Sequence, residues 1–444
     1  MTRIKKFFLR DIRCFGGGHE FDIRPLTFFI GENSTGKSTV MGCLQAVGNL
    51  SGSRFEPHLD FNSEPYQMGA FTDIVRRSNP RNKHFELGLE FEIEGKELRY
   101  FLNLTERDRG SEPIISNTRL VFDDEGEIVF FNHEGDPKKG IEVTAGKNQD
   151  EFHVYGMSHR FDAPSGYLAY LWYLLHDSLE DLDDVSAKLL QYLDRHFPPR
   201  HKKDSHADRF HHMRRLSFDF SGIHSIAPIR SKPKRTYDPL KETETSDGSE
   251  IPMTLMNLST SSAREWETLR KQLLSFGRAS GLFSDISLRR LGRSKSDPFQ
   301  LRIKVRGPAT NLMDVGYGIS QVLPILVRIF TRKRAKFLLQ QPEVHLHPKG
   351  QAELASLLVD INRTRKNSFV IETHSDYMID RVRIEILNGR IKPDDVSLIY
   401  LEPFGNQVKT HNIGFDTQAN MINVPVGYRD FFFDESEKLL GFKD

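Results

Sequence analysis

One short segment near the start of the chain constrains its fold more than any other, because it sets two glycines at a fixed spacing before a lysine and a serine. The segment is Gly31-Glu-Asn-Ser-Thr-Gly-Lys-Ser38, which fits the pattern G-x-x-x-x-G-K-[ST] at every position. The glycines allow the backbone to curl so that successive N–H groups face a phosphate group. The pattern therefore predicts a phosphate-binding P-loop between a buried strand and a helix.

The residues on both sides of this segment agree with that prediction. Leu26 to Ile30 is a short apolar run, as expected of a buried strand, and Ser38 to Val47 is expected to form a helix. That helix would point its positive end at the bound phosphates. Lys37 would add a point charge on the β- and γ-phosphates, and the Ser38 hydroxyl would ligate Mg²⁺. The other residues predicted to bind the nucleotide here are Asn33, Ser34, Thr35, Gly36 and Thr39.

Composition defines the class of protein. The chain has 444 residues, of which 38% are hydrophobic and 28% charged, and this is typical of a globular protein of about three domain equivalents. A formal net charge of +1 gives no bulk preference for nucleic acid, although it leaves room for a local basic patch. With two cysteines, no signal peptide and no apolar run near ~18 residues, we expect a soluble cytoplasmic protein with no membrane partner.

Three later segments place polar residues beside apolar runs. The first, Asp314-Val-Gly-Tyr-Gly-Ile-Ser-Gln321, precedes an apolar helix. In the second, the predicted strand Phe337 to Leu339 is followed by Gln340-Gln-Pro-Glu-Val-His-Leu-His-Pro348. In the third, the predicted strand Ser368 to Ile371 is followed by Glu372-Thr-His-Ser375.

Together with the P-loop, this order of motifs resembles the ABC-class ATPases related to SMC proteins, RecF and the overcoming-lysogenization-defect (OLD) proteins. The resemblance covers about residues 1–50 and 310–380, and residues 425–435 are similar to a C-terminal module of bacterial ATPases of this group. It implies an α/β fold, namely an ABC-type P-loop ATPase head with a mixed sheet, an antiparallel β subdomain and a helical insertion. We expect a P-loop lobe with the antiparallel sheet at residues 1–165, a mainly helical insertion at 166–299, and the signature, Walker B and switch lobe at 300–444.

The resemblance also implies roles for individual residues. Gly316, Gly318, Ser320 and Gln321 are similar to the signature motif, which contacts the γ-phosphate of ATP bound to the opposite subunit. ATP with Mg²⁺ would then join two heads into a dimer, and a higher oligomer is compatible with this. His374 resembles the switch histidine at the γ-phosphate. His345 and His347 are expected to be dimer-interface or turn residues rather than a metal pair.

The pair Gln340-Gln341 departs from the family pattern, because relatives usually carry an acidic residue at position 340 to hold Mg²⁺ through water. Neutral amides give little field at a cation and cannot take a proton from water. The nearest carboxylate in sequence is Glu343, so the predicted catalytic set is Gln340, Gln341, Glu343 and His374, with Gln340 beside the metal. Either the natural protein uses Glu343 and hydrolyses ATP slowly, or Gln340 is a Glu→Gln change introduced to trap ATP.

Two further features leave alternatives open. Residues 198–215 carry His201, His206, His211 and His212 among basic residues, where a solvated linker, a metal site and a nucleic-acid patch compete as interpretations. Only 444 − 374 = 70 residues follow His374, without the clustered carboxylates of the Toprim nuclease domain of OLD proteins. We therefore expect that the chain is not a nuclease by itself.

Two functional hypotheses follow from the resemblance. In the first, the chain is a conformational ATPase that acts as sensor or scaffold for a separate nuclease or toxin in anti-phage defence, as in Septu, PARIS or retron-associated systems. In the second, it is a RecF-like repair or recombination ATPase that clamps DNA as an ATP-dependent dimer. A transporter subunit fits less well, because 316 − 37 = 279 residues separate the P-loop lysine from the signature segment.

Overall fold

A computed structural model describes the chain over residues 3–50, 59–77, 83–93, 96–106, 108, 110–122, 126–132, 141–145, 150–154, 223–238, 243–294 and 296–428. The histidine-rich stretch at 198–215, most of the C-terminal module at 425–435, and residues 166–222 of the expected helical insertion lie outside these ranges.

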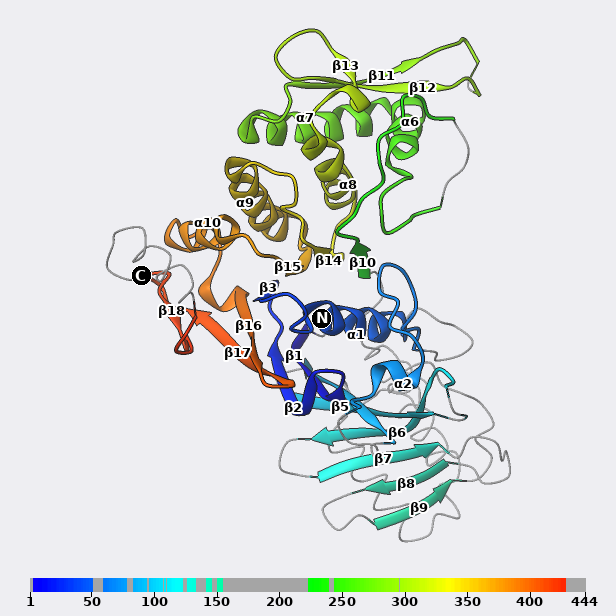
Figure 1. The fold of residues 1–444 in the computed structure, drawn as a ribbon, viewed down its shortest axis with the longest axis vertical. Helices are drawn as coiled ribbons and strands as arrows, with labels where there is room; N and C mark the ends of the chain where they lie inside the picture. The colour runs from blue at the N-terminus through cyan, green and yellow to red at the C-terminus, as the bar shows by residue number, and fades with distance from the viewer. Residues whose placement is uncertain are drawn as a thin grey trace, which may run out of the picture.

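A seven-stranded mixed sheet forms the centre of the molecule, in the order β10-β14-β15-β3-β16-β17-β18 (Figure 1). Its first five strands run parallel, and the last two are antiparallel additions at one edge. The sheet joins β3 from the start of the chain to β10 and to five strands that follow residue 335. The strands are β10 (Ile223–Ile226), β14 (Lys336–Gln340), β15 (Ser368–Glu372), β3 (Leu26–Gly31), β16 (Val396–Phe404), β17 (Gln407–Phe415) and β18 (Met421–Ile422).

Alternate side chains of the parallel strands enter two different hydrophobic cores, because successive residues of a strand point to opposite faces of the sheet. In β3, Phe29 packs into the core formed with α1 (Lys37–Leu50) and the antiparallel sheet. Its neighbours Phe28 and Ile30 pack into the core formed with helices on the other face. These helices include α7 (Ala263–Ser280), α8 (Tyr317–Thr331), α9 (Pro348–Arg365) and α10 (Asp376–Leu387), and α6 (Ile251–Ser261) also contributes residues to this core.

An antiparallel sheet in the order β2-β1-β4-β5-β6-β7-β8-β9 lies at one end of the molecule (Figure 1). The apolar–polar alternation of residues 84–104 is typical of a half-buried antiparallel hairpin, and β4 and β5 do pair antiparallel. However, β4 is buried on both faces, where Glu86 and Glu90 form ion pairs of 2.8 Å with Arg119 and Arg99. The strands are β1 (Arg3–Ile12), β2 (Phe15–Asp22), β4 (Phe85–Ile93), β5 (Lys96–Glu106), β6 (Pro113–Phe122), β7 (Gly126–Asn132), β8 (Ile141–Ala145) and β9 (Asp150–Val154), and the short helix α2 (Phe71–Ile74) lies beside them.

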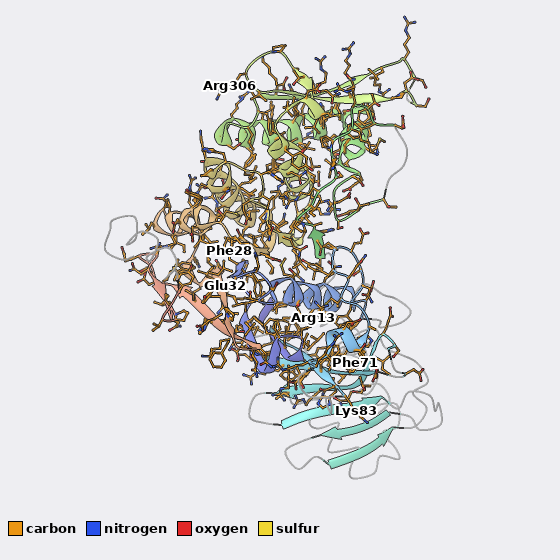
Figure 2. The ribbon with its side chains drawn as sticks, viewed as in Figure 1. Arg13, Phe28, Glu32, Phe71, Lys83 and Arg306 are labelled. Carbon is orange, nitrogen blue, oxygen red and sulfur yellow. The ribbon has the colours of Figure 1, made fainter. Side chains whose placement is uncertain are left out.

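The opposite end of the molecule carries a three-stranded antiparallel sheet of β11 (Asp285–Arg290), β12 (Phe299–Lys304) and β13 (Thr310–Asn311). It lies over α6 (Ile251–Ser261) and α7, far from α1 (Figure 1). Helix α7 begins where the Ser262 hydroxyl accepts a hydrogen bond from the Glu265 N–H, and it ends at Gly281, whose φ of +76° suits glycine. Figure 2 shows Arg306 of this end and Arg13 near α1 well apart.

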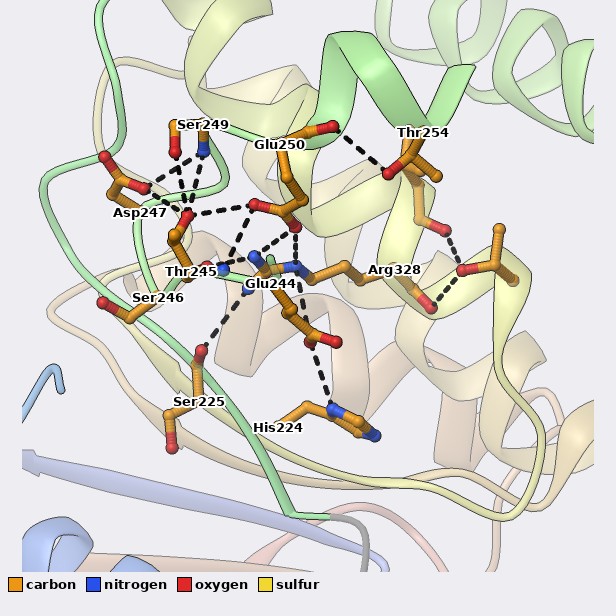
Figure 3. Close-up of polar contacts among 12 residues, drawn as sticks. His224, Ser225, Glu244, Thr245, Ser246, Asp247, Ser249, Glu250, Thr254 and Arg328 are labelled. Atoms are coloured by element: carbon orange, nitrogen blue, oxygen red, sulfur yellow. Dashed lines mark hydrogen bonds and ion pairs between the residues drawn. The ribbon is translucent and has the colours of Figure 1, made fainter. Parts of the chain in front are cut away.

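Strand β10 lies within the range that the sequence assigned to a mainly helical insertion, yet it is an edge strand of the central sheet, parallel to β14. The segment after β10 is held by Arg328 of α8, whose side chain is buried (Figure 3). Arg328 pairs with Glu250 at 2.6 Å and donates to the backbone carbonyls of Thr245 and Ser225. These bonds tie α8 to the segment between β10 and α6.

The described residues confirm an α/β fold that combines a mixed sheet with antiparallel sheets. Among them, no helix has both the length and the apolar character needed to cross a membrane.

Candidate nucleotide-binding site

The P-loop has the backbone conformation that its glycines predict. Gly31 ends β3 with a φ of +141°, and a Cβ there would lie 2.5 Å from the Leu401 carbonyl oxygen of β16. Gly36 has a φ of +91°, and a Cβ there would lie 2.7 Å from both Cys14 Sγ and the Phe15 ring. Both positions combine a conformation and a close approach that exclude any side chain. The loop is therefore fixed against β16 on one side and the start of β2 on the other.

Lys37 is folded back over this loop. It is buried, and its ammonium donates to the carbonyls of Gly31 at 3.0 Å and Glu32 at 2.6 Å. Burial lowers the pKa of Lys37, and the nearby carboxylates of Glu372 and Glu32 oppose this shift. The Thr35 hydroxyl donates to the Glu32 carbonyl at 2.9 Å and closes the turn.

A pocket of about 330 Å³ opens over the P-loop, in the range typical of small-molecule sites. Its walls combine the P-loop with two residues of the β1–β2 turn and one residue from the end of β15. Arg13 of that turn donates to the Thr39 hydroxyl at 3.2 Å and to the Met68 carbonyl at 2.8 Å, so its guanidinium is held beside the loop. The lining residues are Arg13, Cys14, Asn33, Ser34, Gly36, Lys37, Ser38, Thr39 and Glu372.

Glu372 is the carboxylate that sequence analysis quoted within a motif without giving it a role. The Ser38 hydroxyl donates to Glu372 Oε2 at 3.0 Å, and the side chain of Glu372 is buried. The strand order places β15 between β3 and β14, so the residue at the end of β15 lies next to the P-loop. Only the order of the strands in the sheet reveals this proximity. In the sequence, the only signal for it was that the second and third motifs each follow an apolar run.

Glu343 and His374 are brought together in the loops after β14 and β15. Glu343 Oε1 accepts a hydrogen bond of 2.8 Å from the His374 backbone N–H, while the buried Oε2 has no partner among the described residues. Burial raises the pKa of Glu343, although hydrogen bonds from the backbone N–H groups of His374 and Glu343 and from the Thr373 side chain, and the charge of Arg230, oppose the shift. Partial burial first, and the charge of Lys37 second, lower the pKa of the His374 imidazole. Neither Glu343 nor His374 lines the pocket over the P-loop.

Gln340 and Gln341 stand beside this region, but neither lines the pocket. Gln340 is buried, and its Nε2 approaches Glu372 Oε2 at 3.5 Å. The carbonyls of both glutamines accept from Arg230 Nη2, at 3.0 and 3.3 Å. No sequence motif indicated Arg230, whose side chain is almost completely buried and whose pKa burial lowers to about 10.

The signature segment lies apart from the pocket lining. Gly316 is exposed at the start of α8 beside Tyr317, which is 39% exposed. The structure buries Gly318, Ser320 and Gln321, however. The Ser320 hydroxyl donates to the Tyr317 carbonyl, and Gln321 Oε1 accepts from the Arg230 N–H.

Gly318 packs directly on the loop after β14. A Cβ at this glycine would lie 2.5 Å from the His345 carbonyl oxygen. The rings of Tyr317 and His345 meet edge to face at 4.9 Å, and the side chains of His345 and His347 are exposed. The start of α8 and the loop after β14 therefore form one surface.

A glycine-bounded loop between a parallel strand and a helix, with a buried lysine and a pocket above it, defines a P-loop nucleotide-binding protein. Residues 26–380 match the family described as "AAA domain, putative AbiEii toxin, Type IV TA system", and the chain belongs to this family of AAA-domain ATPases. No curated protein matches the chain.

Solved structures of Smc heads show a loose overall likeness to the chain. An Smc head bound to the C-winged helix domain of ScpA is 12% identical, with a TM-score of 0.43 over 93% of this chain and 98% of that one. An Smc head from Pyrococcus furiosus with an extended coiled coil, bound to the C-terminal domain of ScpA, is 10% identical, with a TM-score of 0.43 over 99% of both chains. The Thermotoga maritima head is 12% identical, with a TM-score of 0.39 over 96% of this chain and 100% of that one.

Proposed function

We propose that the protein is a conformational ATPase in which two chains close around ATP, and that this closure controls a separate effector protein. The P-loop amides and Lys37 hold the β- and γ-phosphates, and Arg13 and Cys14 line the wall beside them. Mg²⁺, held from the Ser38 side, would neutralise charge on the phosphates. Glu343 takes the proton of the attacking water, and His374 contacts the γ-phosphate.

One observation carries the proposal that the site is shared. The pocket lining includes no residue of the signature segment, whereas Gly316 and Tyr317 are exposed at the free start of α8. The signature segment of a second copy would instead complete the site from outside, which makes ATP part of the interface.

The test is the mass in solution, measured by light scattering with and without ATP and Mg²⁺. We expect ATP to raise the mass to that of a dimer and Lys37→Ala to abolish the increase. Gly316→Glu is the second arm, because a negative side chain at the exposed start of α8 repels the partner's γ-phosphate. It should prevent dimer formation while ATP still binds the monomer. A mass that does not respond to ATP would contradict the shared site.

The effector role rests on the family. Its description names a putative AbiEii toxin of a type IV toxin–antitoxin system, which supports a role in defence. The separate nuclease or toxin as partner is an analogy with the defence systems that the motifs resemble. We expect the native protein to copurify with the product of a neighbouring gene and to release it, or activate it, when ATP is added. If the Lys37→Ala variant still binds the partner and still releases or activates it when ATP is added, this would argue against control by ATP.

A basic surface favours DNA clamping as the second candidate function. The described ends and loops of β11 and β12 expose several cations although the whole chain carries a net charge of +1. These exposed residues are Arg289, Arg293, Lys304 and Arg306. If they bind duplex DNA, affinity should fall steeply as salt increases, and a quadruple change to glutamine should flatten that dependence. A scaffold for a toxin would show no such binding.

A further inference from the structure

The carboxylate nearest to the P-loop serine does not come from β14, where the family pattern places it. It comes from Glu372 at the end of β15. Ser38 Oγ and Glu372 Oε2 lie 3.0 Å apart, and both residues line the pocket. Gln340 approaches the same oxygen at 3.5 Å but does not line the pocket.

The register of the central sheet explains this arrangement. Glu372 pairs with Gln340 on one side and with Phe29 of β3 on the other, so β14 and β15 end at one level, two residues before β3 ends at Gly31. Because β15 lies between β14 and β3, its last residue is one strand closer to the P-loop than the last residue of β14. A carboxylate at position 372 therefore reaches Ser38 directly.

The donor atoms at this point fit a magnesium ion. Mg²⁺ prefers oxygen ligands at 2.0–2.1 Å in an octahedron, so adjacent ligands are about 3.0 Å apart. The hydroxyl of Ser38 and the carboxylate of Glu372 have this chemistry and this spacing. Glu372 is also buried, which strengthens its field at a nearby cation.

The neutral amide at position 340 is consistent with this arrangement. Its NH₂ group faces Glu372 Oε2, whereas a second carboxylate at 3.5 Å would repel the first. The acid thus stands at the end of β15, and the amide stands on β14, where relatives usually carry an acidic residue. Gln340 is then a native positioning residue, and no engineered change is needed to explain it.

We propose that Glu372 is the carboxylate that holds Mg²⁺ with Ser38, and that Gln340 is its neutral neighbour. This inference rests on the proposed binding of ATP in the P-loop pocket. Glu372 thus takes the position beside the metal that the sequence predicted for Gln340.

The experiment is calorimetric titration of the full chain with ATP, in Mg²⁺ and in EDTA, beside electron paramagnetic resonance of Mn²⁺ bound with ADP. We expect Glu372→Gln to lose about 10–100-fold of the metal-dependent gain in affinity, while binding in EDTA is unchanged or tighter. The electron paramagnetic resonance spectrum of bound Mn²⁺ should also differ between Glu372→Gln and the wild type. Glu353→Gln, a surface change on α9, is the matched control and should behave as the wild type. A Glu372→Gln protein with the full metal-dependent gain would overturn the inference.

An exchange variant gives a second arm that does not depend on the stability of Glu372→Gln. Gln340→Glu alone sets two carboxylates side by side, so Mg²⁺ should raise its melting temperature more than that of the wild type. The double variant Gln340→Glu/Glu372→Gln should recover part of the metal-dependent affinity. Equal Mg²⁺ stabilisation of Gln340→Glu and wild type would also overturn the assignment. If the wild type binds no ATP under either condition, the proposed function itself fails.

Discussion

Two buried arginines, Arg328 and Arg230, differ in how many of their side-chain nitrogens have a hydrogen-bond partner. This difference distinguishes a residue that supports the fold from a residue beside the candidate site. Arg328 is buried in α8, and each of its nitrogens has a partner among Glu250, Thr245 and Ser225 (Figure 3). Arg230 is equally buried, but its Nε and Nη1 have no partner in the described part of the chain.

Unsatisfied groups gather around Arg230. Gln321 Nε2 and Glu343 Oε2 are also buried without a described partner, and both residues interact with Arg230. Buried polar groups are normally paired, because an unpaired donor or acceptor costs about 1–3 kcal/mol. The Arg328 network, in which each side-chain nitrogen is paired, thus has a structural role. The Arg230 region has hydrogen-bonding groups without a described partner beside the loop that carries Glu343.

The largest expected effect is on folding, from Arg328→Ala. The change leaves Glu250 buried without its counter-ion, so the free energy of unfolding should fall by about 3–5 kcal/mol. Urea unfolding measures this, and the ATP affinity of the protein that remains folded should be unchanged. Arg328→Met, which replaces the charge with an apolar chain of similar length, separates loss of packing from loss of the pair. A loss below about 1 kcal/mol would end the contrast between the two arginines.

A smaller effect, on turnover, is expected from Arg230→Ala. Arg230 Nη2 holds the carbonyls of Gln340 and Gln341, which precede Glu343 in the loop. Its removal lets the base shift, and kcat should fall by up to roughly 100-fold with little change in ATP affinity. Arg230→Lys keeps a charge but not the forked donors, so intermediate kcat is expected. Steady-state ATP hydrolysis with unchanged kcat for Arg230→Ala would place this arginine with the structural group.

On the acid side of the pH–rate profile, kcat should begin to fall at a higher pH, because burial raises the pKa of Glu343. The base acts only when deprotonated, so kcat should fall about tenfold per pH unit below that raised pKa. The fall therefore begins at higher pH than an ordinary glutamate would give. Glu343→Gln should lose the activity, whereas His374→Gln should lower kcat and leave the acid limb in place. A rate that stays level down to the ordinary pKa of 4.5 would exclude Glu343 as the base.

The smallest expected effect tests the structural role of the network around Arg328 and Glu250. The Thr245 hydroxyl lies 3.0 Å from Glu250 Oε2 and 2.6 Å from Asp247 Oδ1. Thr245→Val keeps the shape and removes these bonds, so the free energy of unfolding should fall by about 1–2 kcal/mol. Thr245→Ser is the control that retains the hydroxyl. Equal stability of the two variants in urea would mean that the hydroxyl contributes nothing.

Sequence predicted the parts of this molecule that are local. The apolar run of β3, the glycines of the P-loop and the runs of β14 and β15 each carry their own signal, and the α/β fold follows from them. The strand β10 was missed because four residues at a sheet edge, Ile223 to Ile226, have no periodicity to detect. Its pairing with β14 is a long-range contact.

The site shows the same division. The sequence indicated the P-loop residues, Glu343 and His374, but the proximity of Glu372 to Ser38 depends on the order of strands. The burial of Gln321 against Arg230 likewise depends on how α8 packs, because a motif fixes residue types and not the direction of a side chain. The roles given to the signature residues and to the catalytic set stay predictions.

The contact between Gly318 and the His345 carbonyl also has a mechanical consequence. The absence of a side chain at position 318 lets the start of α8 touch the backbone of the loop after β14, and the edge-to-face rings of Tyr317 and His345 resist separation. The two segments therefore pack against each other without an intervening side chain at position 318. We expect a displacement of the exposed start of α8 to be passed to the loop that carries Glu343.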